Sequence, residues 1–345
     1  MKERILLIRR DNIGDLVLTT PLITALRVAR PDAWIGFLAN SYSAPVLSGN
    51  PHLDAIYTYD KAKHRPDDLR WRVYASTART LLTLRCLKMD WVILAGPAPQ
   101  RQAHVLARWI SPRRMVGFVT PEFAPRSISQ PVAYAQGASL HETEDVFRLL
   151  APLGIEGAIP PGSVYADQQR VTALRAELEV KLGTSGCLVG VQISARRPRQ
   201  RWPMEHFAQM MMRLHAIQAA RFVLFWAPGA EDDARHPGDD GKARQLLELL
   251  PSAFPVFAHA TTELAGLISG LSLVDALITP DGGAMHLAAA LGKPVLALFG
   301  DSPAARWHPW HVPHQIVRGA AGAVETIGVE EVLSAWERLA PSVLG

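Results

Sequence analysis

Cysteine is scarce in this sequence, with only Cys86 and Cys187 among 345 residues. The two lie far apart in the chain and in no spacing typical of metal ligands, which argues against both a disulfide framework and a zinc site. Such sparing use of cysteine is typical of a reducing compartment. We therefore expect a cytoplasmic protein.

Long apolar runs are also missing. No stretch reaches the roughly 18 apolar residues that a membrane-spanning helix needs. The apolar run near the N-terminus is short and is followed by charged residues, so we expect no signal peptide. Hydrophobic residues make up 48% of the chain and charged residues 20%, an ordinary globular balance, and the length favours about two domains.

Charge is distributed unevenly along the chain. Residues 1–168 contain 20 Lys and Arg against 15 Asp and Glu, a net charge of +5, whereas residues 169–345 contain 16 against 17, a net charge of −1. A basic N-terminal half favours an anionic partner, such as an acidic glycan or an anionic lipid surface. The sequence has no zinc-ligand spacing or RNA-binding motif and its basic residues are scattered, so we expect no nucleic acid partner.

Short apolar runs alternate with helix-patterned segments along the whole chain. At the start, Arg4–Ile8, Leu16–Val28 and Trp34–Leu38 predict strand, helix and strand, an order typical of a parallel sheet. Residues 156–168 are rich in Pro and Gly and predict a linker. The sequence thus predicts two doubly wound α/β domains with a cleft between them, and Val329–Leu339 as a final amphipathic helix.

The segment Thr279–Gly300 contains the most informative junction. A buried-type strand leads into Asp281-Gly282-Gly283 and then into a helix that carries His286. Adjacent glycines allow a ligand to approach the backbone, and the unpaired N–H groups of a helix start favour a phosphate. The alternative is an ordinary turn between strand and helix, with His286 as a polar surface residue.

Other polar residues follow predicted strands and would gather at the same edges. A basic segment, SARRPRQRWP, begins at Ser194, and Glu231 follows a later strand. Arginines and a helix start suit a diphosphate, and a carboxylate suits ribose hydroxyls. In the N-terminal half, Asp15 follows the first strand. Each residue also has a structural alternative: the arginines as a solvated loop, and Glu231 and Asp15 as helix or turn caps.

Taken together, these segments resemble glycosyltransferase family 9, the bacterial lipopolysaccharide heptosyltransferases. The resemblance rests on five segments in the family's order, spread over nearly the whole chain: RILLIRRDNIGDLVLTTPLITALR, HETEDVFRLL, SARRPRQRWPMEHFAQMM, GAED and DGGAMHLAAALGKPVLALFG. The pairing of the Gly-Asp segment with the Asp-x-Gly-x-x-His segment is fairly specific to that family.

The resemblance implies a GT-B fold with two Rossmann-like domains. Residues 1–160 would bind the acceptor and residues 161–328 the nucleotide sugar, with the C-terminal helix, residues 329–345, packing back on the first domain. Asp15 would be the general base that deprotonates the acceptor hydroxyl. The expected donor-binding residues are Ser194, Arg199, Arg201, Glu231, Thr262, Asp281, Gly282, Gly283, Ala284 and His286.

One position departs from the family pattern. The family commonly has Lys two residues before the Trp-Pro pair, where this chain has Gln200. We expect Arg199 or Arg201 to supply the missing charge, since Arg favours bidentate phosphate contacts. The alternatives are a donor other than ADP-heptose or weak activity.

The resemblance therefore implies an inverting transfer of heptose from ADP-heptose that needs neither metal nor cofactor. The expected partners are the nucleotide-sugar donor and an anionic glycan or glycolipid acceptor, with peripheral contact with the inner membrane as a further expectation. The alternatives are a GT-B enzyme using another nucleotide sugar and a non-catalytic sugar-nucleotide-binding protein.

Overall fold

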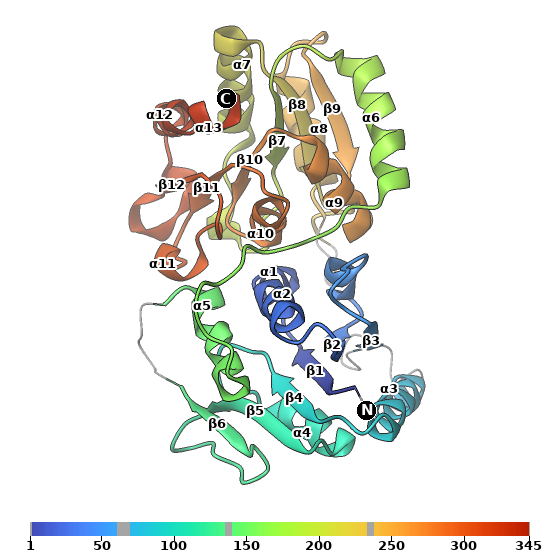
Figure 1. Cartoon of the computed structure of the whole chain (residues 1–345). Coiled ribbons are helices and arrows are strands. Elements are labelled where there is room, and N and C mark those ends of the chain that lie inside the picture. The colour runs from blue at the N-terminus through green and yellow to red at the C-terminus, as the bar shows by residue number, and fades with distance from the viewer. Residues whose placement is uncertain (1, 61–69, 135–139, 233–237, 345) are drawn as a thin grey trace. The chain divides into compact units, whose positions relative to one another are not determined.

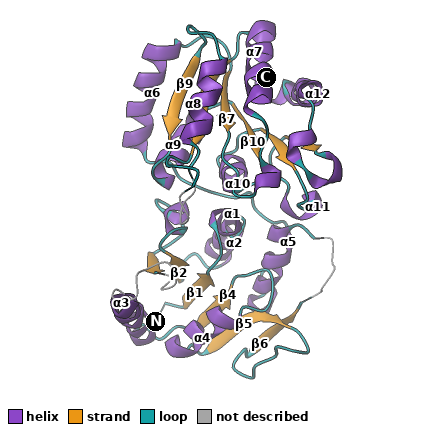
Figure 2. Cartoon of the chain, turned by 180° about the vertical axis from the view of Figure 1, so that it is seen from behind, coloured by secondary structure: helices purple, strands orange, loops and turns teal. Residues whose placement is uncertain are grey.

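The computed structural model describes residues 2–60, 70–134, 140–232 and 238–344. The chain divides into two compact units, Met1–Ser163 and Val164–Gly345. Each unit is built on one six-stranded parallel sheet with helices packed on it (Figures 1 and 2). This architecture confirms the predicted doubly wound α/β fold.

The sheet of the first unit has the strand order β3-β2-β1-β4-β5-β6. Strands β2 and β3 follow β1 toward one edge of the sheet. Strand β4 then pairs with the other side of β1, and β5 and β6 continue toward the opposite edge, so the strand order reverses between β1 and β4. The strands are β1 Arg4–Arg9, β2 Trp34–Asn40, β3 Ala55–Tyr59, β4 Trp91–Leu94, β5 Arg114–Val119 and β6 Gln130–Ala133.

The helix predicted over Leu16–Val28 is divided in the structure. It becomes α1 and α2, with Thr19 as the N-cap of α2 and Pro21, which has no N–H, in its first turn. The segment HETEDVFRLL lies in α5 and in a 3₁₀ segment that contains Pro152. The helices are α1 Ile13–Val17, α2 Thr20–Ala29, α3 Arg70–Cys86, α4 Arg101–Ile110 and α5 Glu142–Phe147, with 3₁₀ turns at Ala44–Leu47 and Arg148–Leu153.

The second unit repeats the arrangement with the strand order β12-β11-β10-β7-β8-β9, which reverses between β7 and β10. Every residue of β10 and β11 is buried, as their continuous apolar sequences predict. The strands are β7 Leu188–Gln192, β8 Arg221–Trp226, β9 Val256–Ala260, β10 Ala276–Pro280, β11 Val295–Phe299 and β12 His314–Arg318.

The helices of the second unit pack as two groups, α7 with α8 and α12, and α9 with α6 and α10. A hydrophobic core cluster of this unit includes buried residues of α7, α8 and α12. The helices are α6 Gln168–Leu182, α7 Met204–Gln218, α8 Asp240–Leu249, α9 Leu264–Leu273, α10 Gly283–Ala290, α11 Ala304–Trp307, α12 Val329–Leu339 and α13 Pro341–Leu344, with 3₁₀ turns at Pro198–Gln200, Ala320–Gly322 and Val324–Thr326.

Packing of the C-terminal helix on the first domain stays a prediction, and within the second unit this helix, α12, is part of the core. Helix α12 contacts α7, β11 and β12 of the second unit. Trp336 is buried in the same core cluster as Trp202 and Phe207. In addition, the indole of Trp202 donates a hydrogen bond to the carbonyl of Ile327, just before α12. The apolar side chains along one face of α12 are buried in this core.

Strands β3, β6 and β12 were not predicted from the sequence. They lie at sheet edges, and most of their residues are only partly buried or are exposed. Their sequences therefore lack the continuous apolar character of the central strands. Among the helices in the described ranges, none is long and apolar enough to cross a membrane.

Candidate active site

In the second unit, the loops that follow β7 and β10 meet where the strand order reverses. Ligands of open α/β sheets bind at such a point, beyond the carboxyl ends of the strands. Gln200, from the first loop, is buried and donates hydrogen bonds to the Asp281 carboxylate at 3.2 Å and to Ser302 Oγ at 3.3 Å. Position 200 thus joins the basic loop to the start of the Asp281-Gly282-Gly283 turn. Ser302 was not predicted as part of this group.

Burial raises the pKa of Asp281, and the neighbouring charge of Asp301 acts in the same direction. A hydrogen bond with Ser302 and the charge of Arg197 oppose the shift without cancelling it. Burial of this side chain therefore disfavours its charged form relative to an exposed carboxylate.

The turn at Gly282 leaves the start of α10 open. Gly282 is the N-cap of this helix, and no side chain caps it. A Cβ atom at Gly282 would have no neighbour within 4 Å, so nothing covers this position among the described residues. The first N–H groups of a helix have no partners within it and attract anions. The start of α10 at Gly282, Gly283 and Ala284 is therefore a candidate anion site.

His286 lies one turn into α10 and is buried. Its ring is edge-on to the indole of Trp307, with the ring centres 6.3 Å apart. The side chain therefore supports the start of α10 from within the core as well as lying near the predicted phosphate site. This position excludes the alternative of a polar surface residue.

The two arginines expected to replace the family Lys differ in their surroundings. Arg201 is three-quarters buried and donates from Nε to the carbonyl of Ala195 and from Nη1 to Glu231 at 2.9 Å. Arg199 is exposed and donates to the carbonyl of Ala321 at 3.2 Å. Arg201 is therefore held more firmly and connects the loops that follow β7 and β8.

Glu231 belongs to a chain of alternating charges. Its carboxylate accepts from Lys242 Nζ at 2.8 Å as well as from Arg201, and Lys242 also contacts Asp239 at 2.6 Å. The hydrogen bond and charge of Lys242, with a further contribution from Arg201, lower the pKa of Glu231. Glu231 is thus kept as an anion and acceptor, suited to hydroxyl groups. Lys242 was not predicted, because its pairing with Glu231 depends on the fold.

The last two predicted donor residues lie in neighbouring loops. Ser194 Oγ accepts from the backbone N–H of Ala227 at 2.9 Å, which connects the ends of β7 and β8. Thr262 is exposed and directly precedes the N-cap of α9, Glu263. The predicted donor residues therefore come from the loops that follow β7, β8, β9 and β10, which share one edge of the sheet.

In the first unit, polar residues gather around Arg9 at the end of β1. The Arg9 side chain has no exposed surface and contacts three carboxylates: Asp11 at 3.0 Å, Asp15 at 3.4 Å and Glu142 at 2.7 Å. Burial alone would lower the pKa of Arg9, but the charges of Glu142, Asp15 and Asp11 outweigh it, and the pKa is raised. Neither Arg9 nor Glu142 was predicted as a site residue.

Asp15 has a structural role and is partly exposed to solvent. Its carboxylate accepts from the backbone N–H of Asn12 at 3.0 Å, which makes it a helix-capping residue of α1. The side chain remains 19% exposed, unlike the fully buried Arg9 and Glu142 to which it is linked. The structural alternative, a helix cap, is thus confirmed, and the side chain also keeps some contact with solvent.

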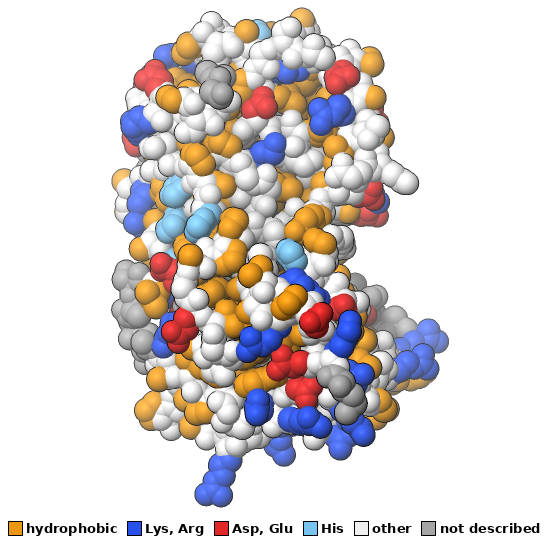
Figure 3. Space-filling model, in the orientation of Figure 1, with side chains coloured by type: hydrophobic (Ala, Val, Ile, Leu, Met, Phe, Trp, Pro, Cys, Tyr) orange, Lys and Arg blue, Asp and Glu red, His pale blue; other side chains and the backbone are white. Residues whose placement is uncertain are grey.

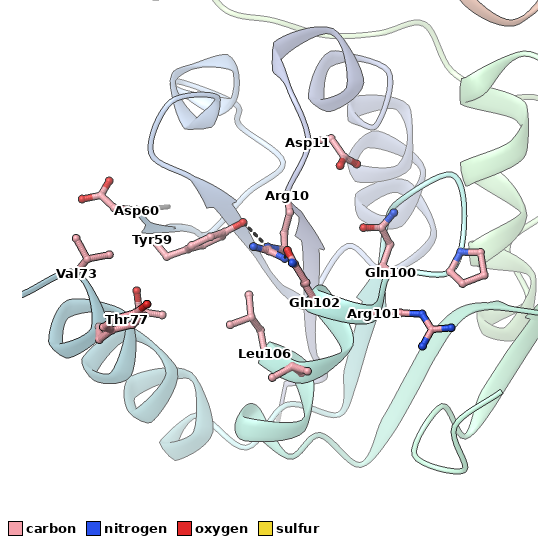
Figure 4. A pocket seen from close by; sticks show the side chains of 13 residues that line it. Arg10, Asp11, Tyr59, Asp60, Val73, Thr77, Gln100, Arg101, Gln102 and Leu106 are labelled. Atoms are coloured by element: carbon pink, nitrogen blue, oxygen red, sulfur yellow. Dashed lines mark hydrogen bonds between the residues drawn. The ribbon is translucent and has the colours of Figure 1, made fainter. Parts of the chain in front are cut away.

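A cavity of about 810 Å³ opens beside this cluster (Figure 4). Its lining comes from the loops after β1 and β4, on either side of the reversal in strand order, and from α3 and α4. Arg10 crosses it, donating from Nε to the Tyr59 hydroxyl at 2.8 Å and from Nη1 to Gln102. Asp11 lines the cavity and also binds Arg9. The cavity therefore adjoins the residues that hold Asp15.

Within the residues that the structure describes, no group of three or more His, Cys, Asp and Glu side chains is arranged to hold a metal ion. The candidate residues fall into two sets. Asp15 and the cavity belong to the first unit, and the predicted donor residues belong to the second.

Comparisons with known proteins agree with this geometry. Residues 122–336 match the sequence model of glycosyltransferase family 9 (heptosyltransferase). Lipopolysaccharide heptosyltransferase 3 of Escherichia coli K12 is 28% identical, over 95% of this chain and 95% of its own.

Two solved structures have the same fold. A glycosyltransferase family 9 protein from Veillonella parvula aligns with a TM-score of 0.84 at 20% identity, over 99% of this chain and 98% of its own. The heptosyltransferase WaaC of E. coli with ADP aligns with a TM-score of 0.77 at 18% identity, over 97% and 99%. Because the family model spans more than half of the sequence, the chain belongs to glycosyltransferase family 9, the heptosyltransferases, and is a glycosyltransferase with the GT-B fold.

Proposed function

We propose that this enzyme transfers heptose from ADP-heptose to a lipopolysaccharide-core sugar or a related glycan, with inversion and without a metal ion. The observation that carries the proposal is the group of loops at the strand-order reversal of the second unit, which combines an open helix start with Glu231 and Arg201. The name of the E. coli relative and the ADP bound to WaaC support heptose and adenosine diphosphate as parts of the donor.

In the proposed reaction, a hydroxyl oxygen of the acceptor attacks the anomeric carbon of the donor from the face opposite ADP. The new C–O bond forms as the bond from that carbon to the diphosphate oxygen breaks. Asp15 takes the hydroxyl proton, and ADP leaves with the bonding electrons. The single displacement inverts the configuration at the anomeric carbon. Asp15 suits this role because it is fixed by Asn12 and Arg9 and its side chain is still partly exposed.

The departing diphosphate gains negative charge, which needs stabilisation. In the proposal, the N–H groups at the start of α10 and the guanidinium of Arg201 supply it, and Glu231 accepts from the ribose hydroxyls. Arg201 is preferred over Arg199 because two loops fix its position. Ser194 and Thr262 from neighbouring loops and His286 from α10 complete the donor site.

The acceptor belongs in the cavity of the first unit. An arginine held by Tyr59 and Gln102, together with Asp11 and Asp60, offers both donors and acceptors to sugar hydroxyls and acidic substituents. Gln102→Leu should therefore raise the acceptor KM several-fold and leave the donor KM unchanged. Equal acceptor KM values for the variant and wild type would remove the cavity from the proposal. Peripheral contact with a membrane fits an acceptor carried by a glycolipid.

A thermal-shift screen of nucleotide sugars tests the donor. A ligand that binds only the folded protein raises its melting temperature, so ADP-heptose should stabilise the enzyme more than UDP- or GDP-sugars do. A larger shift with another nucleotide sugar would replace ADP-heptose by that donor. This outcome is the one that Gln200, in place of the family Lys, would favour.

A further inference from the structure

Helix α3 exposes apolar side chains that a soluble surface would normally lack. Trp71, Ala75, Ala78 and Leu82 recur at helical spacing and are all exposed, whereas the opposite face buries Val73 and Leu84. Trp71 and Leu82 are each at least 60% exposed. Single exposed apolar residues are ordinary, but a stripe along one helix marks an interaction surface.

Arginines flank this stripe, and acidic residues are missing from it. The sequences of α3 and α4 contain six arginines and no Asp or Glu. Arg72 and Arg79 lie along one side of the α3 stripe, and both are exposed. Figure 3 shows Lys and Arg side chains together with hydrophobic ones along the edge of the first unit where α3 lies. The surface therefore combines apolar and cationic groups.

Helix α4 continues the same surface. It packs beside α3, and Arg85 of α3 donates a hydrogen bond to the backbone carbonyl of Trp109 at 2.9 Å. The Trp109 side chain is 65% exposed, and Arg108 beside it is exposed as well. We define the α3–α4 surface by six exposed side chains: Trp71, Arg72, Arg79, Leu82, Arg108 and Trp109.

We propose that the α3–α4 surface docks the enzyme on a bilayer that contains anionic lipids. Trp and Leu side chains suit the boundary between headgroups and acyl chains, and arginines are attracted to the negative surface potential. An amphipathic helix with tryptophan on its apolar side and basic residues beside it is typical of interfacial binding.

The acceptor cavity lies at the border of this surface. Tyr74 of α3 and Val105 of α4 both line the cavity, and each is more than half exposed. A glycolipid whose acyl chains remain in the docked bilayer would therefore present its sugar part at the cavity. This link to the acceptor rests on the proposed function, whereas lipid binding by the surface does not.

Charge and apolarity together favour lipid over nucleic acid. Arginines and aromatic rings are also found in nucleic-acid sites, but there the aromatic side chains stack on bases and the affinity follows phosphate contacts. The exposed Ala75, Ala78 and Leu82 offer no planar surface or hydrogen bond to a base. They can, however, be buried among acyl chains.

Sedimentation with vesicles tests the proposal without any substrate. Wild-type enzyme is mixed at about 0.1 M salt with vesicles of phosphatidylcholine alone or with 30% phosphatidylglycerol, and the bound fraction is measured. We expect binding to the anionic vesicles only. Arg72→Glu/Arg79→Glu and Trp71→Gln/Trp109→Gln should each lower the partition coefficient at least tenfold.

The matched control is Arg175→Glu/Val180→Gln on α6, which changes an exposed arginine and an exposed apolar residue of the second unit. It should bind vesicles as wild type does. The proposal would be overturned if wild type did not bind the anionic vesicles, or if the control variant lost as much vesicle binding as the surface variants. It would also be overturned if wild type bound an RNA or DNA duplex more tightly than the vesicles at the same salt.

An activity measurement separates this inference from the proposed function. The two surface variants should retain wild-type kcat with a water-soluble, deacylated acceptor and lose rate only with acceptor embedded in vesicles. If wild type binds anionic vesicles but transfers no heptose to either acceptor, the proposed function fails and the docking surface stands. Equal rate losses with both acceptors would contradict a docking role.

Discussion

A guanidinium without contact with water must find all its partners inside the protein. Arg9 does so: its N–H groups reach Asp11, Asp15 and Glu142, with Thr19 and the carbonyl of Ala95 taking the rest. Removing one partner of a buried ion pair leaves an uncompensated charge, which is costly. The Arg9 cluster therefore stabilises the first unit and fixes the position of Asp15.

Replacing Arg9 by Met should lower the free energy of unfolding of the first unit by about 3–5 kcal/mol, measured by urea denaturation. Adding Glu142→Gln should recover part of the loss, because it removes the unpaired buried charge. The control is Arg113→Met, which breaks an ion pair of 3.0 Å to Asp90 on the surface and should cost less than about 1 kcal/mol. Equal losses in the two Arg variants would argue against a structural role for the cluster.

Asp15→Asn tests the proposed base directly. The Asn side chain keeps an oxygen that can accept from the Asn12 N–H, so the helix cap is retained while the proton acceptor is lost. We expect kcat to fall by about 10²-fold or more, with donor KM unchanged. Turnover within a few-fold of wild type would reduce Asp15 to a helix cap.

Arg201→Ala should raise the barrier by about 2–4 kcal/mol through kcat rather than donor KM, because the leaving diphosphate needs the charge most in the transition state. Gln200→Lys in this variant should restore part of the rate, since position 200 adjoins Asp281 at the same turn. Arg199→Ala, which removes an exposed arginine of the same loop, serves as the comparison. Wild-type kcat in Arg201→Ala would assign the cation to another residue.

At the scale of elements, α12 connects the end of the chain to the core of the second unit. Trp336→Ala should lower the stability of this unit by about 3–5 kcal/mol, the usual cost of a buried Trp. Hydrogen exchange should show the loss of protection in residues 164–345. Ile217→Ala, at an exposed position of α7, should have little effect. Loss of protection confined to residues 2–163 would contradict the placement of α12.

The elements that the sequence predicts best are those whose environment dictates the residue types of their own segment. Strands such as β10 and β11 are buried on both faces and must be apolar throughout, so their sequences reveal them. Edge strands such as β12 need no such run. The turn at Gly282 was predicted because a glycine pair and a helix start are local signals.

The contacts that complete the site could not be predicted in this way. Arg9 and Glu142 are 133 positions apart, and Gln200 and Asp281 are 81 apart. Lys242 reaches Glu231 from the helix that follows its loop. Such pairs depend on which strands become neighbours, and no local pattern carries that information.

At the scale of the whole molecule, each of the two units provides a strand-order reversal with polar loops around it. The first unit adds a cavity, a carboxylate held by a buried arginine and a basic, apolar outer surface. The second adds an open helix start and a network of paired charges. These differences match the division between a sugar acceptor and a nucleotide donor that we propose.

The most direct test of this proposal is transfer of radiolabelled heptose from ADP-heptose to a lipopolysaccharide-core acceptor in the presence of EDTA. We predict a product with inverted anomeric configuration and a rate that EDTA leaves unchanged, because backbone N–H groups and Arg201 balance the leaving diphosphate. No transfer from ADP-heptose, while another nucleotide sugar supports turnover, would contradict the donor. Loss of activity in EDTA that Mg²⁺ or Mn²⁺ restores would contradict the metal-free mechanism.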